Sequence, residues 1–420
     1  MSMKILHTAD LHLGQILYQQ YDRTDEHLHF FKQLEKWVKE YQPDALVVSG
    51  DIFDIPHPSA SCWRFFTERF VALREAAPDM HIAIVAGNHD SAARLQSNSK
   101  IWTYADTTVI GTPPPSDFKD LTGWEKNYIV ELPSGYLILL PWFGADRTEA
   151  AIALQQYVAE INSDNLPVVM TAHMAVQGAD LTGHDDEIGR LRTIDIERLG
   201  DGYDYLALGH IHCPQTLVGN VQSDNQKYLS PVARYSGSVL HVNCDEAYPH
   251  SVSMVEIDRH KGEIDIKELR INQLRHFYNL PSNKESFGDQ KEIMKFLADF
   301  LHNQSKKDED ERSWYIRLRI RYSTPLSADF NNQVYQLIEE SGIDVRYNPK
   351  HLWVDMPEET ESDNEGVNEE IAVEHLQQME NPLEFIYLTK ERYINLNFDF
   401  LPEAFREIED ELKKMEEEEK

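Results

Sequence analysis

Cysteine is scarce in this sequence of 420 residues, which contains only three. These residues, Cys62, Cys213 and Cys244, are too scattered for a disulfide framework or a Cys-x-x-Cys zinc site. Long apolar runs are also lacking, since no stretch approaches the roughly 18 residues of a membrane span, and the mean hydropathy is -0.52. Residues Met1–Lys4 lead directly into a strand pattern, so we expect no signal peptide. These absences predict a soluble cytoplasmic protein from a reducing compartment, with no membrane partner.

Positive charge is in short supply, and the formal net charge is -32. Residues 351–420 carry 22 acidic and 6 basic residues, a net of -16, and the five times longer segment 1–350 carries 50 and 34, also -16. The acidity is therefore concentrated near the C-terminal end. Net charge bears on solubility and non-specific binding rather than on fold. A chain of this charge is expected to bind DNA weakly by itself, unless metal ions or a partner offset its field.

Short apolar runs alternate with helical patterns through the first 210 or so residues. The predicted strands are Lys4–Thr8, Ala45–Ser49, Ile82–Ala86, Tyr136–Leu140, Val168–Thr171 and Tyr205–Leu208. The predicted helices are Thr24–Tyr41, Ser61–Ala76 and Thr148–Ile161, with Thr24 and Ser61 as N-caps. A hairpin is expected from His250–Asp258 and Glu263–Ile271. Because the strands are apolar on both faces, they suit a sheet covered on both sides in an α/β fold.

The pattern changes after Arg275 and divides the chain into four parts. Residues 1–274 form the predicted main domain, and residues 275–356 form a small α+β capping domain. The cap elements are a helix over Asp289–His302, a strand over Trp314–Tyr322, a helix over Asp329–Ser341 and a strand near Trp353, with a charged loop at Lys306–Arg312. Residues 357–372 are acidic, lack core-forming residues and are expected to be a linker. Residues 373–420 return to helical patterns and form a helical tail.

Five segments share one pattern, an apolar strand followed by a residue that can bind metal. The candidate ligands are Asp10, His12, Asp51, Asn88, His173, His210 and His212. In open α/β sheets, sites form beyond the carboxyl ends of the strands. Gly50, Gly87 and Gly209 directly precede three of the ligands, and glycine permits the tight turn and close approach that such a site needs. Any one of these residues alone is more often a helix cap, a turn former or a surface residue, but five strand ends with the same pattern indicate a metal site.

The mixture of His, Asp and Asn suits Mn, Fe, Zn or a similar first-row ion, rather than a thiolate zinc site or a calcium cage. Seven candidate ligands are too many for one tetrahedral ion but fit two ions that share a bridging ligand. Two ions about 3.5–4 Å apart can hold a phosphate and lower the pKa of a bridging water. The predicted reaction class is hydrolysis of phosphodiesters or phosphomonoesters.

These motifs resemble those of a known superfamily, the calcineurin-like metallophosphoesterases. The five motifs of that superfamily, D-x-H, G-D, G-N-H-[DE], H and G-H-x-H, occur in this sequence in the same order. The finer motifs are similar to the SbcD nuclease family, in Asp10-Leu-His-Leu-Gly14, Gly50-Asp-Ile-Phe-Asp54, Gly87-Asn-His-Asp-Ser91 with Arg94-Leu95, Gly209-His-Ile-His212 and Tyr235-Ser-Gly-Ser238. The resemblance covers residues 1–275 or so, and beyond them only the layout of a small cap and a helical tail matches.

The resemblance implies a role for each candidate. Asp10, His12 and His212 would bind one ion, Asn88, His173 and His210 the other, and Asp51 would bridge them. His89 would be catalytic, stabilising the transition state or donating a proton to the leaving 3′ oxygen, and Asp90 would orient a neighbour. It also implies a two-sheet sandwich flanked by helices and Mn²⁺ as the preferred ion. Family members act as a 3′→5′ exonuclease on duplexes and an endonuclease on single strands and hairpins, with the coiled-coil ATPase SbcC, in DNA repair and recombination. A homodimer within a heterotetramer follows from the same resemblance.

Two segments beyond the main domain carry further predictions. In the strand that begins at Trp314, the guanidinium groups of Arg317, Arg319 and Arg321 share one face and could grip DNA phosphates, or form a solvated face paired with nearby acids. In the tail, an apolar stripe on a charged helix could pack on the partner's coiled coil or dock on its own domain. The stripe consists of Phe405, Ile408, Leu412 and Met415.

Two competing functions use the same ligands. A general calcineurin-like phosphatase or phosphodiesterase for small phosphoesters would need no cap, arginine strand or partner helix. A non-catalytic DNA-end scaffold would keep the metals for structure alone, and the full ligand set together with His89 argues against it.

Overall fold

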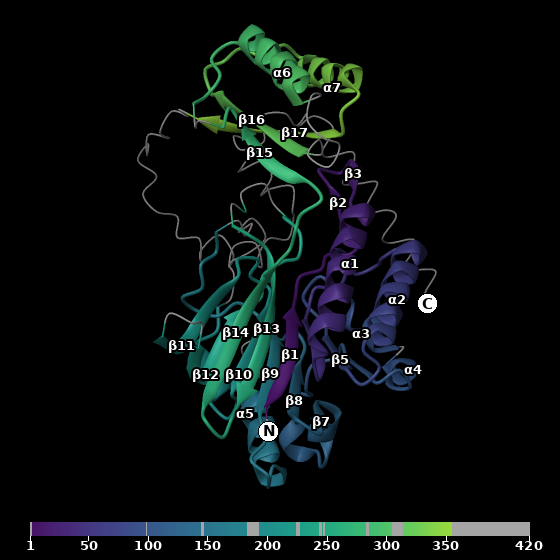
Figure 1. Cartoon of the computed structure of the whole chain (residues 1–420), viewed down its shortest axis with the longest axis vertical. Coiled ribbons are helices and arrows are strands. Elements are labelled where there is room, and N and C mark those ends of the chain that lie inside the picture. Colours follow the sequence, from purple (N-terminus) through teal and green to yellow (C-terminus); the bar gives the residue numbers. More distant parts are fainter. Residues whose placement is uncertain are drawn as a thin grey trace, which may run out of the picture. The chain divides into compact units, whose positions relative to one another are not determined.

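The computed structural model describes residues 2–97, 99–143, 147–182, 193–223, 227–242, 246, 248–282, 285–304 and 314–354 (Figure 1). Together these residues fall within one compact unit, 1–355. None of the helices formed by these residues is long and apolar enough to span a bilayer. The predicted loop Lys306–Arg312, the linker 357–372 and the tail 373–420 lie outside the described residues.

The main sheet has twelve strands and two parallel halves. The first half is β6(Thr107–Ile110), β5(His81–Val85), β4(Ala45–Ser49) and β1(Met3–Thr8), in that order. The second half contains β12(Lys227–Tyr235), β10(Tyr205–Gly209), β9(Val168–His173) and β8(Gly135–Leu140), with β7(Ile129–Leu132) antiparallel at its edge. The hairpin of β13(Ser251–Asp258) and β14(Glu263–Arg270) joins β1 to β12, and β11(Gln215–Ser223) pairs with β12.

The two halves face each other and enclose one core, which gives the expected sandwich. Val47 and Val85 of the first half share this core with Leu139 and Ala207 of the second. Across the layers, the Ser49 hydroxyl lies 2.8 Å from that of Thr171. Residues that alternate with the inner ones, such as Leu46 and Ile84, form a second core beneath the helices.

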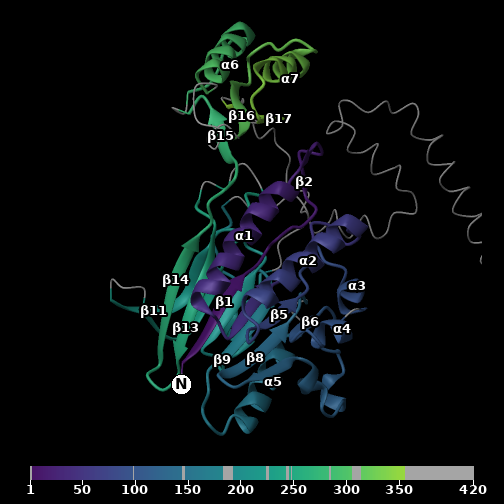
Figure 2. The ribbon, with the colours of Figure 1, turned by 45° about the vertical axis from the view of Figure 1, so that its right-hand side comes forward.

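Helices cover the outer faces of the sandwich. α1(Thr24–Tyr41) and α2(Ala60–Ala76) lie over the first half (Figure 2), where Phe30 and Phe66 pack on the second core. α3(Ala92–Ser97) and α4(Ser99–Thr103) follow β5, and α5(Thr148–Ile161) precedes β9. The shorter elements are β2(Ile16–Leu17), β3(Tyr21–Asp22), η1(Phe118–Asp120), η2(Trp124–Asn127) and η4(Ile196–Leu199).

Residues beyond the hairpin form a separate, smaller sheet. β15(His276–Leu280), β16(Trp314–Arg321) and β17(Val345–Val354) are parallel, and α6(Gln290–Gln304) and α7(Phe330–Ser341) pack on them around a core of their own. This sheet also contacts the start of α1, since Arg275 pairs with Asp25 at 2.7 Å and the Tyr315 hydroxyl donates to Glu26 at 2.8 Å. The domain boundary at 274/275 stays a prediction.

The predicted N-caps are wrong. α1 begins after Arg23, which makes no side-chain cap hydrogen bond. α2 begins after Ser59, whose hydroxyl accepts from the backbone N–H of Cys62. A cap is defined by the backbone of one residue, and Ser59 has the extended conformation that Ser61, inside the helix, lacks.

Candidate metal centre

The seven predicted ligands come together at the carboxyl ends of the parallel strands. Among the described residues, two groups have ligand atoms within 4.8 Å of one another, Asp10 with His12 and His212, and Asp51 with His173 and His210. These are the two sets that the resemblance implied, apart from Asn88 and the bridging role of Asp51. Four strand ends, those of β1, β4, β9 and β10, supply the six side chains.

Asp51 lies between the two groups. Its Oδ2 atom is 3.8 Å from Nε2 of His12, in the first group, and 3.5 Å from Nε2 of His173, in the second. Asp51 is only 2 % exposed. One carboxylate oxygen close to imidazole nitrogens of both groups is the arrangement that a bridging ligand requires.

Asn88, which follows β5, completes the second group. Its Oδ1 atom is 2.9 Å from Nε2 of His173 and 2.9 Å from Nδ1 of His210. An amide oxygen between two imidazole nitrogens is a suitable donor for the ion that those nitrogens would bind.

Glycine is required at two of the turns that bring the loops together. Gly50 has a φ of +90°, and a Cβ atom there would lie 2.2 Å from Nδ1 of His173. At Gly87, a Cβ atom would lie 2.0 Å from Oδ1 of Asp51. The ligand loops therefore approach so closely that no larger residue fits at either position.

Side chains and backbone groups around the ligands fix the orientation of the imidazole rings. Nδ1 of His12 is 3.4 Å from the Asp54 carboxylate, and Nδ1 of His173 is 2.8 Å from the Ser49 carbonyl. A carbonyl only accepts, so Nδ1 of His173 donates and Nε2 is left to face the ion.

Glu246 orients the ring of His212, the other histidine of the first group, in the same way. Its Oε1 atom lies 3.0 Å from Nδ1 of His212, and the carboxylate is 1 % exposed. Burial lowers the pKa of His212 to about 4, so the ring is neutral, as a metal ligand must be. The sequence did not reveal Glu246, because it lies well past the end of β12 at Tyr235 and so does not follow a strand closely. Asp54, by contrast, stands inside the motif that begins at Gly50.

The field at the centre is negative. Burial alone would lower the pKa of His12, but Asp54 and Asp51 outweigh it and raise that pKa to about 9. Against the same effect of burial, Asp51 and Asp10 raise the pKa of His173 to about 9. Both rings are buried, yet their raised pKa values favour the protonated form. The surrounding carboxylates therefore strongly favour positive charge at this centre.

The donor set fits divalent cations. His12 is 3 % exposed, and its Nε2 atom has no hydrogen-bond partner among the described residues. A buried nitrogen without a partner is costly unless a metal or water occupies the space in front of it. Imidazole nitrogens together with carboxylate and amide oxygens suit Mn²⁺, Fe²⁺ or Zn²⁺.

His89 lies beside the centre and is not among the ligands. It is exposed, its ring centroid is 5.0 Å from that of His12, and its backbone N–H donates to Asp51 at 2.9 Å. Nδ1 lies 2.9 Å from the Asp54 carbonyl oxygen, which can only accept. Nε2 is therefore the atom that can exchange a proton with a substrate.

Asp90 supports the loops that carry the ligands. Its carboxylate accepts from the backbone N–H groups of Ile52, Phe53 and Gly87 at 2.9–3.0 Å. These bonds tie the turn after β4 to the turn after β5. This geometry supports the orienting role expected of Asp90.

The three arginines of β16 differ sharply in exposure. Arg317 is 8 % exposed and donates to Oδ1 of Asn279 at 2.8 Å, which makes it a poor phosphate contact and corrects its place in the predicted trio. Arg319 is half-buried and Arg321 is exposed. The same face of the strand begins at Tyr315, which is 1 % exposed and donates to Glu26 of α1, so exposure on this face increases from Tyr315 toward Arg321.

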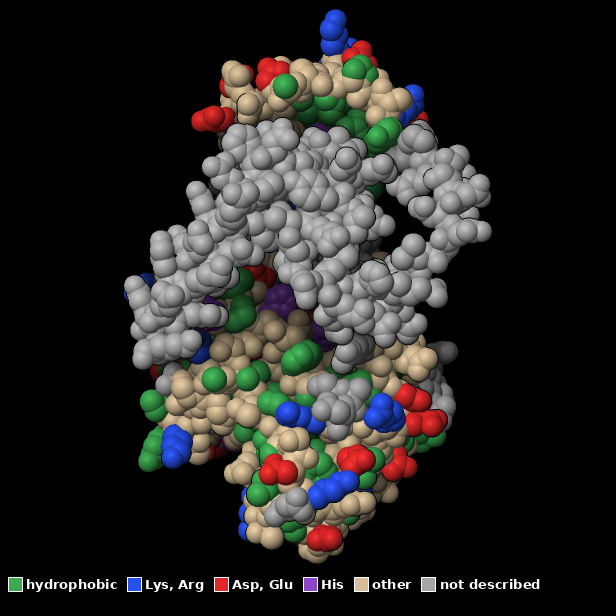
Figure 3. Space-filling model, turned by 180° about the vertical axis from the view of Figure 1, so that it is seen from behind, with side chains coloured by type: hydrophobic (Ala, Val, Ile, Leu, Met, Phe, Trp, Pro, Cys, Tyr) green, Lys and Arg blue, Asp and Glu red, His purple; other side chains and the backbone are tan. Residues whose placement is uncertain are grey.

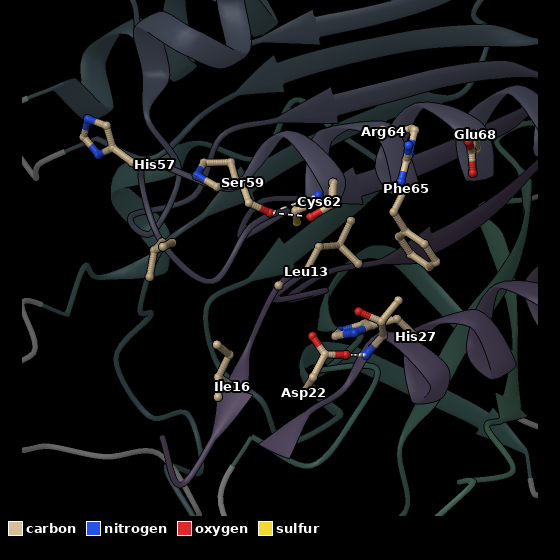
Figure 4. Close-up of a pocket in the computed structure, with 15 residues that line it drawn as sticks. Leu13, Ile16, Asp22, His27, His57, Ser59, Cys62, Arg64, Phe65 and Glu68 are labelled. Carbon is tan, nitrogen blue, oxygen red and sulfur yellow. Dashed lines mark hydrogen bonds between the residues drawn. The ribbon is translucent and has the colours of Figure 1, made fainter. Parts of the chain in front are cut away.

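A separate hollow of about 440 Å³ lies between the first residues of α1 and α2 (Figure 4). Leu13, Ile16 and Phe65 line it, together with the thiol of Cys62. Burial raises the pKa of this thiol to about 11, so it stays protonated and is a poor nucleophile. None of the seven metal-ligand candidates lines the hollow, which leaves the chemistry to the metal centre.

The chain is similar in sequence to known proteins. The family model of the calcineurin-like phosphoesterases matches residues 3–214. The SbcD subunit of the SbcCD nuclease of Staphylococcus saprophyticus is 26% identical over 366 residues, which cover 82% of this chain and 93% of that protein. The proteins of the same name from Escherichia coli K12 and Bacillus subtilis 168 are each 30% identical, over 60% of this chain and 65% and 66% of their own length. Because the family model matches half of the chain and these relatives are similar to it in sequence, the chain belongs to the calcineurin-like phosphoesterases, in the family of SbcD subunits of SbcCD nucleases.

Proposed function

We propose that this chain is the nuclease subunit of an SbcCD-type complex and hydrolyses phosphodiester bonds in DNA. The observation that carries the proposal is the pair of ligand groups with Asp51 between them. The names of the relatives support a nuclease and an SbcC partner. From the family resemblance we propose 3′→5′ exonuclease activity on duplexes and endonuclease activity on single strands and hairpins.

The residues assigned to the ions are those described above. Asp10, His12 and His212 would hold one ion, Asn88, His173 and His210 the other, with Asp51 shared. Two such ions, which we propose to be Mn²⁺, supply charge stabilisation for the phosphate and a more acidic water.

His89 supplies the proton chemistry. With Nδ1 bonded to the Asp54 carbonyl, a protonated ring presents its Nε2–H to the leaving oxygen. The same N–H stabilises negative charge that develops on the phosphate. His89 is thus proposed as the catalytic residue, held in place at both its ring and its backbone N–H.

The partner is proposed to be an SbcC-type coiled-coil ATPase that binds the tail 373–420, in a heterotetramer built on a homodimer. The scarcity of cysteine supports a cytoplasmic location. A phosphoesterase for small substrates remains the second candidate, because the same ligands would serve it.

The test is cleavage of an end-labelled duplex by the purified chain with Mn²⁺, with Mg²⁺ and with chelator. We expect Mn²⁺-dependent shortening from the ends, and a loss of about 10²-fold or more in His89→Asn with Mn²⁺ binding unchanged. Intact DNA beside rapid hydrolysis of a small phosphodiester would favour the second candidate. A His89→Asn variant that cuts like the wild type would point to another proton donor.

A further inference from the structure

A second hollow opens directly beside the metal centre. Its volume is about 330 Å³, and its lining includes Gly87, Asn88, Pro113, Trp142, Phe143 and Arg147. This volume is at the lower end of the range for ligand pockets, about 300–1,000 Å³, so it suits one small group rather than a duplex. The metal ligand Asn88 forms part of its wall, so a molecule held there would lie next to the reacting phosphate.

Trp142 is fixed at the same edge of the sheet as the ligands. In the register of the parallel pair β8–β9, Leu140 lies opposite Ala172, the residue before His173. Trp142 comes two residues later, and its backbone N–H donates to the Ala86 carbonyl at 2.8 Å. The residue is therefore anchored to the strand ends that carry Asn88 and His173, which belong to one ligand group.

The indole of Trp142 is exposed where the neighbouring aromatic is not. Trp142 is 48% exposed, whereas Phe143 is 4% exposed. Scattered exposed aromatics are common on protein surfaces, but this one lines a hollow that also contains a metal ligand. On the face seen from behind, histidine side chains reach the surface next to apolar ones (Figure 3).

The chemistry of the hollow matches one nucleotide. An exposed indole offers a flat surface on which a base can stack, and Phe143 and Pro113 make the lining apolar. Arg147 lines the same hollow, and its Nη1 atom donates to the Pro114 carbonyl at 3.0 Å. This bond holds a positive charge beside the site, although the chain as a whole has a net charge of -32.

We propose that Trp142 is a specificity-determining residue that stacks on the base of a nucleotide adjoining the scissile phosphate. This proposal rests on the proposed function. It names the substrate feature that the centre selects, which is the base of the nucleotide next to the scissile phosphate. Stacking is tolerant of base identity, since each base has a π face. The site thus favours nucleic acid over other phosphodiesters without a preferred sequence.

The test compares chromogenic diesters that carry a nucleoside with one that carries none. Thymidine 5′-(4-nitrophenyl) phosphate and its 3′ isomer are set against methyl 4-nitrophenyl phosphate, with Mn²⁺. We expect kcat/KM for at least one thymidine ester to exceed that of the methyl ester, and Trp142→Ala to reduce this preference by about 5- to 100-fold. Trp142→Phe should keep most of the preference. Hydrolysis of the methyl ester should change less than about twofold in both variants.

Leu121→Ala is the matched control, because Leu121 is 44 % exposed and does not line the hollow. As a binding readout, thymidine 5′-monophosphate should quench part of the tryptophan fluorescence of the wild type, and this part should be lost in Trp142→Ala. Equal losses on all the esters, or a thymidine preference that survives Trp142→Ala, would overturn the proposal. If the wild type hydrolyses none of the esters and leaves DNA intact, the proposed function itself fails.

Discussion

At the scale of single residues, the centre depends on side chains that hold the ligands as well as on the ligands. Glu246 shows this most directly, because each of its two oxygens has a partner. Oε1 lies 3.0 Å from Nδ1 of His212, and Oε2 accepts from the backbone N–H of Val242 at 3.0 Å, which holds the carboxylate in place. As a carboxylate it can only accept from His212, which leaves the opposite ring nitrogen of the ligand with its lone pair.

We therefore predict that Glu246→Gln weakens one of two metal sites. The amide keeps the shape but loses the charge that makes His212 a better donor, and we expect a loss of about 10- to 100-fold in Mn²⁺ affinity. Calorimetric titration with Mn²⁺ would resolve the two sites, and only one should change. Glu256→Gln, at an exposed position on β13, serves as the control. Equal Mn²⁺ affinity in Glu246→Gln and the wild type would contradict the role given to this residue.

The candidate ligands could be proposed from the sequence because each lies at the end of a strand or within a few residues of it. Asp51, for example, comes two residues after Ala45–Ser49, the strand whose predicted bounds match the structure. Glu246 and Trp142 were not predictable, because their roles come from contacts made across the fold. Glu246 meets His212, 34 residues away in the sequence, and Trp142 meets the Ala86 carbonyl. No local pattern encodes either contact.

At the scale of elements, apolar periodicity was a good guide to α1 and α5, whose predicted bounds match, but it did not give the environment of β16. Alternation correctly placed Ile316, Leu318 and Ile320 in the core of the small sheet. It could not show that Tyr315, on the opposite face, bonds to Glu26 of α1, or that Arg317 bonds to Asn279 of β15, since both partners come from other elements. Arg317 is buried although its period is that of an exposed face.

The arginines of β16 should separate into a structural and a DNA-contacting group. We predict that Arg321→Ala weakens duplex binding at about 50 mM salt and lowers the slope of log K against log salt by about 1, the value for one phosphate contact. Arg317→Ala should instead reduce the free energy of unfolding by about 1–3 kcal/mol, because Asn279 loses its buried partner. Fluorescence anisotropy and thermal unfolding measure the two effects. A loss of DNA binding in Arg317→Ala with unchanged stability would reverse this assignment.

At the scale of the whole molecule, charge and proposed substrate are in conflict. A net charge of -32 repels a polyanion, while the centre itself needs carboxylates to bind its ions. The acids are densest in residues 357–420, which contain the linker and the tail that we propose for the partner. The partner would thus contribute DNA affinity that this chain lacks, and its binding would place the acidic segment against a protein rather than near DNA.

Removal of residues 357–420 tests this division of roles. The deletion takes away 21 acidic and 6 basic residues, a net of -15. Because like charges repel over about 10 Å at 0.1 M salt, we expect the shortened chain to bind duplex DNA several-fold more tightly at low salt. The difference should disappear at about 0.5 M salt, where screening is nearly complete. Size-exclusion chromatography with an SbcC-type ATPase should show that the shortened chain no longer co-elutes with it. Unchanged DNA affinity at low salt together with retained ATPase binding would mean that neither the acidity nor the partner contact belongs to this segment.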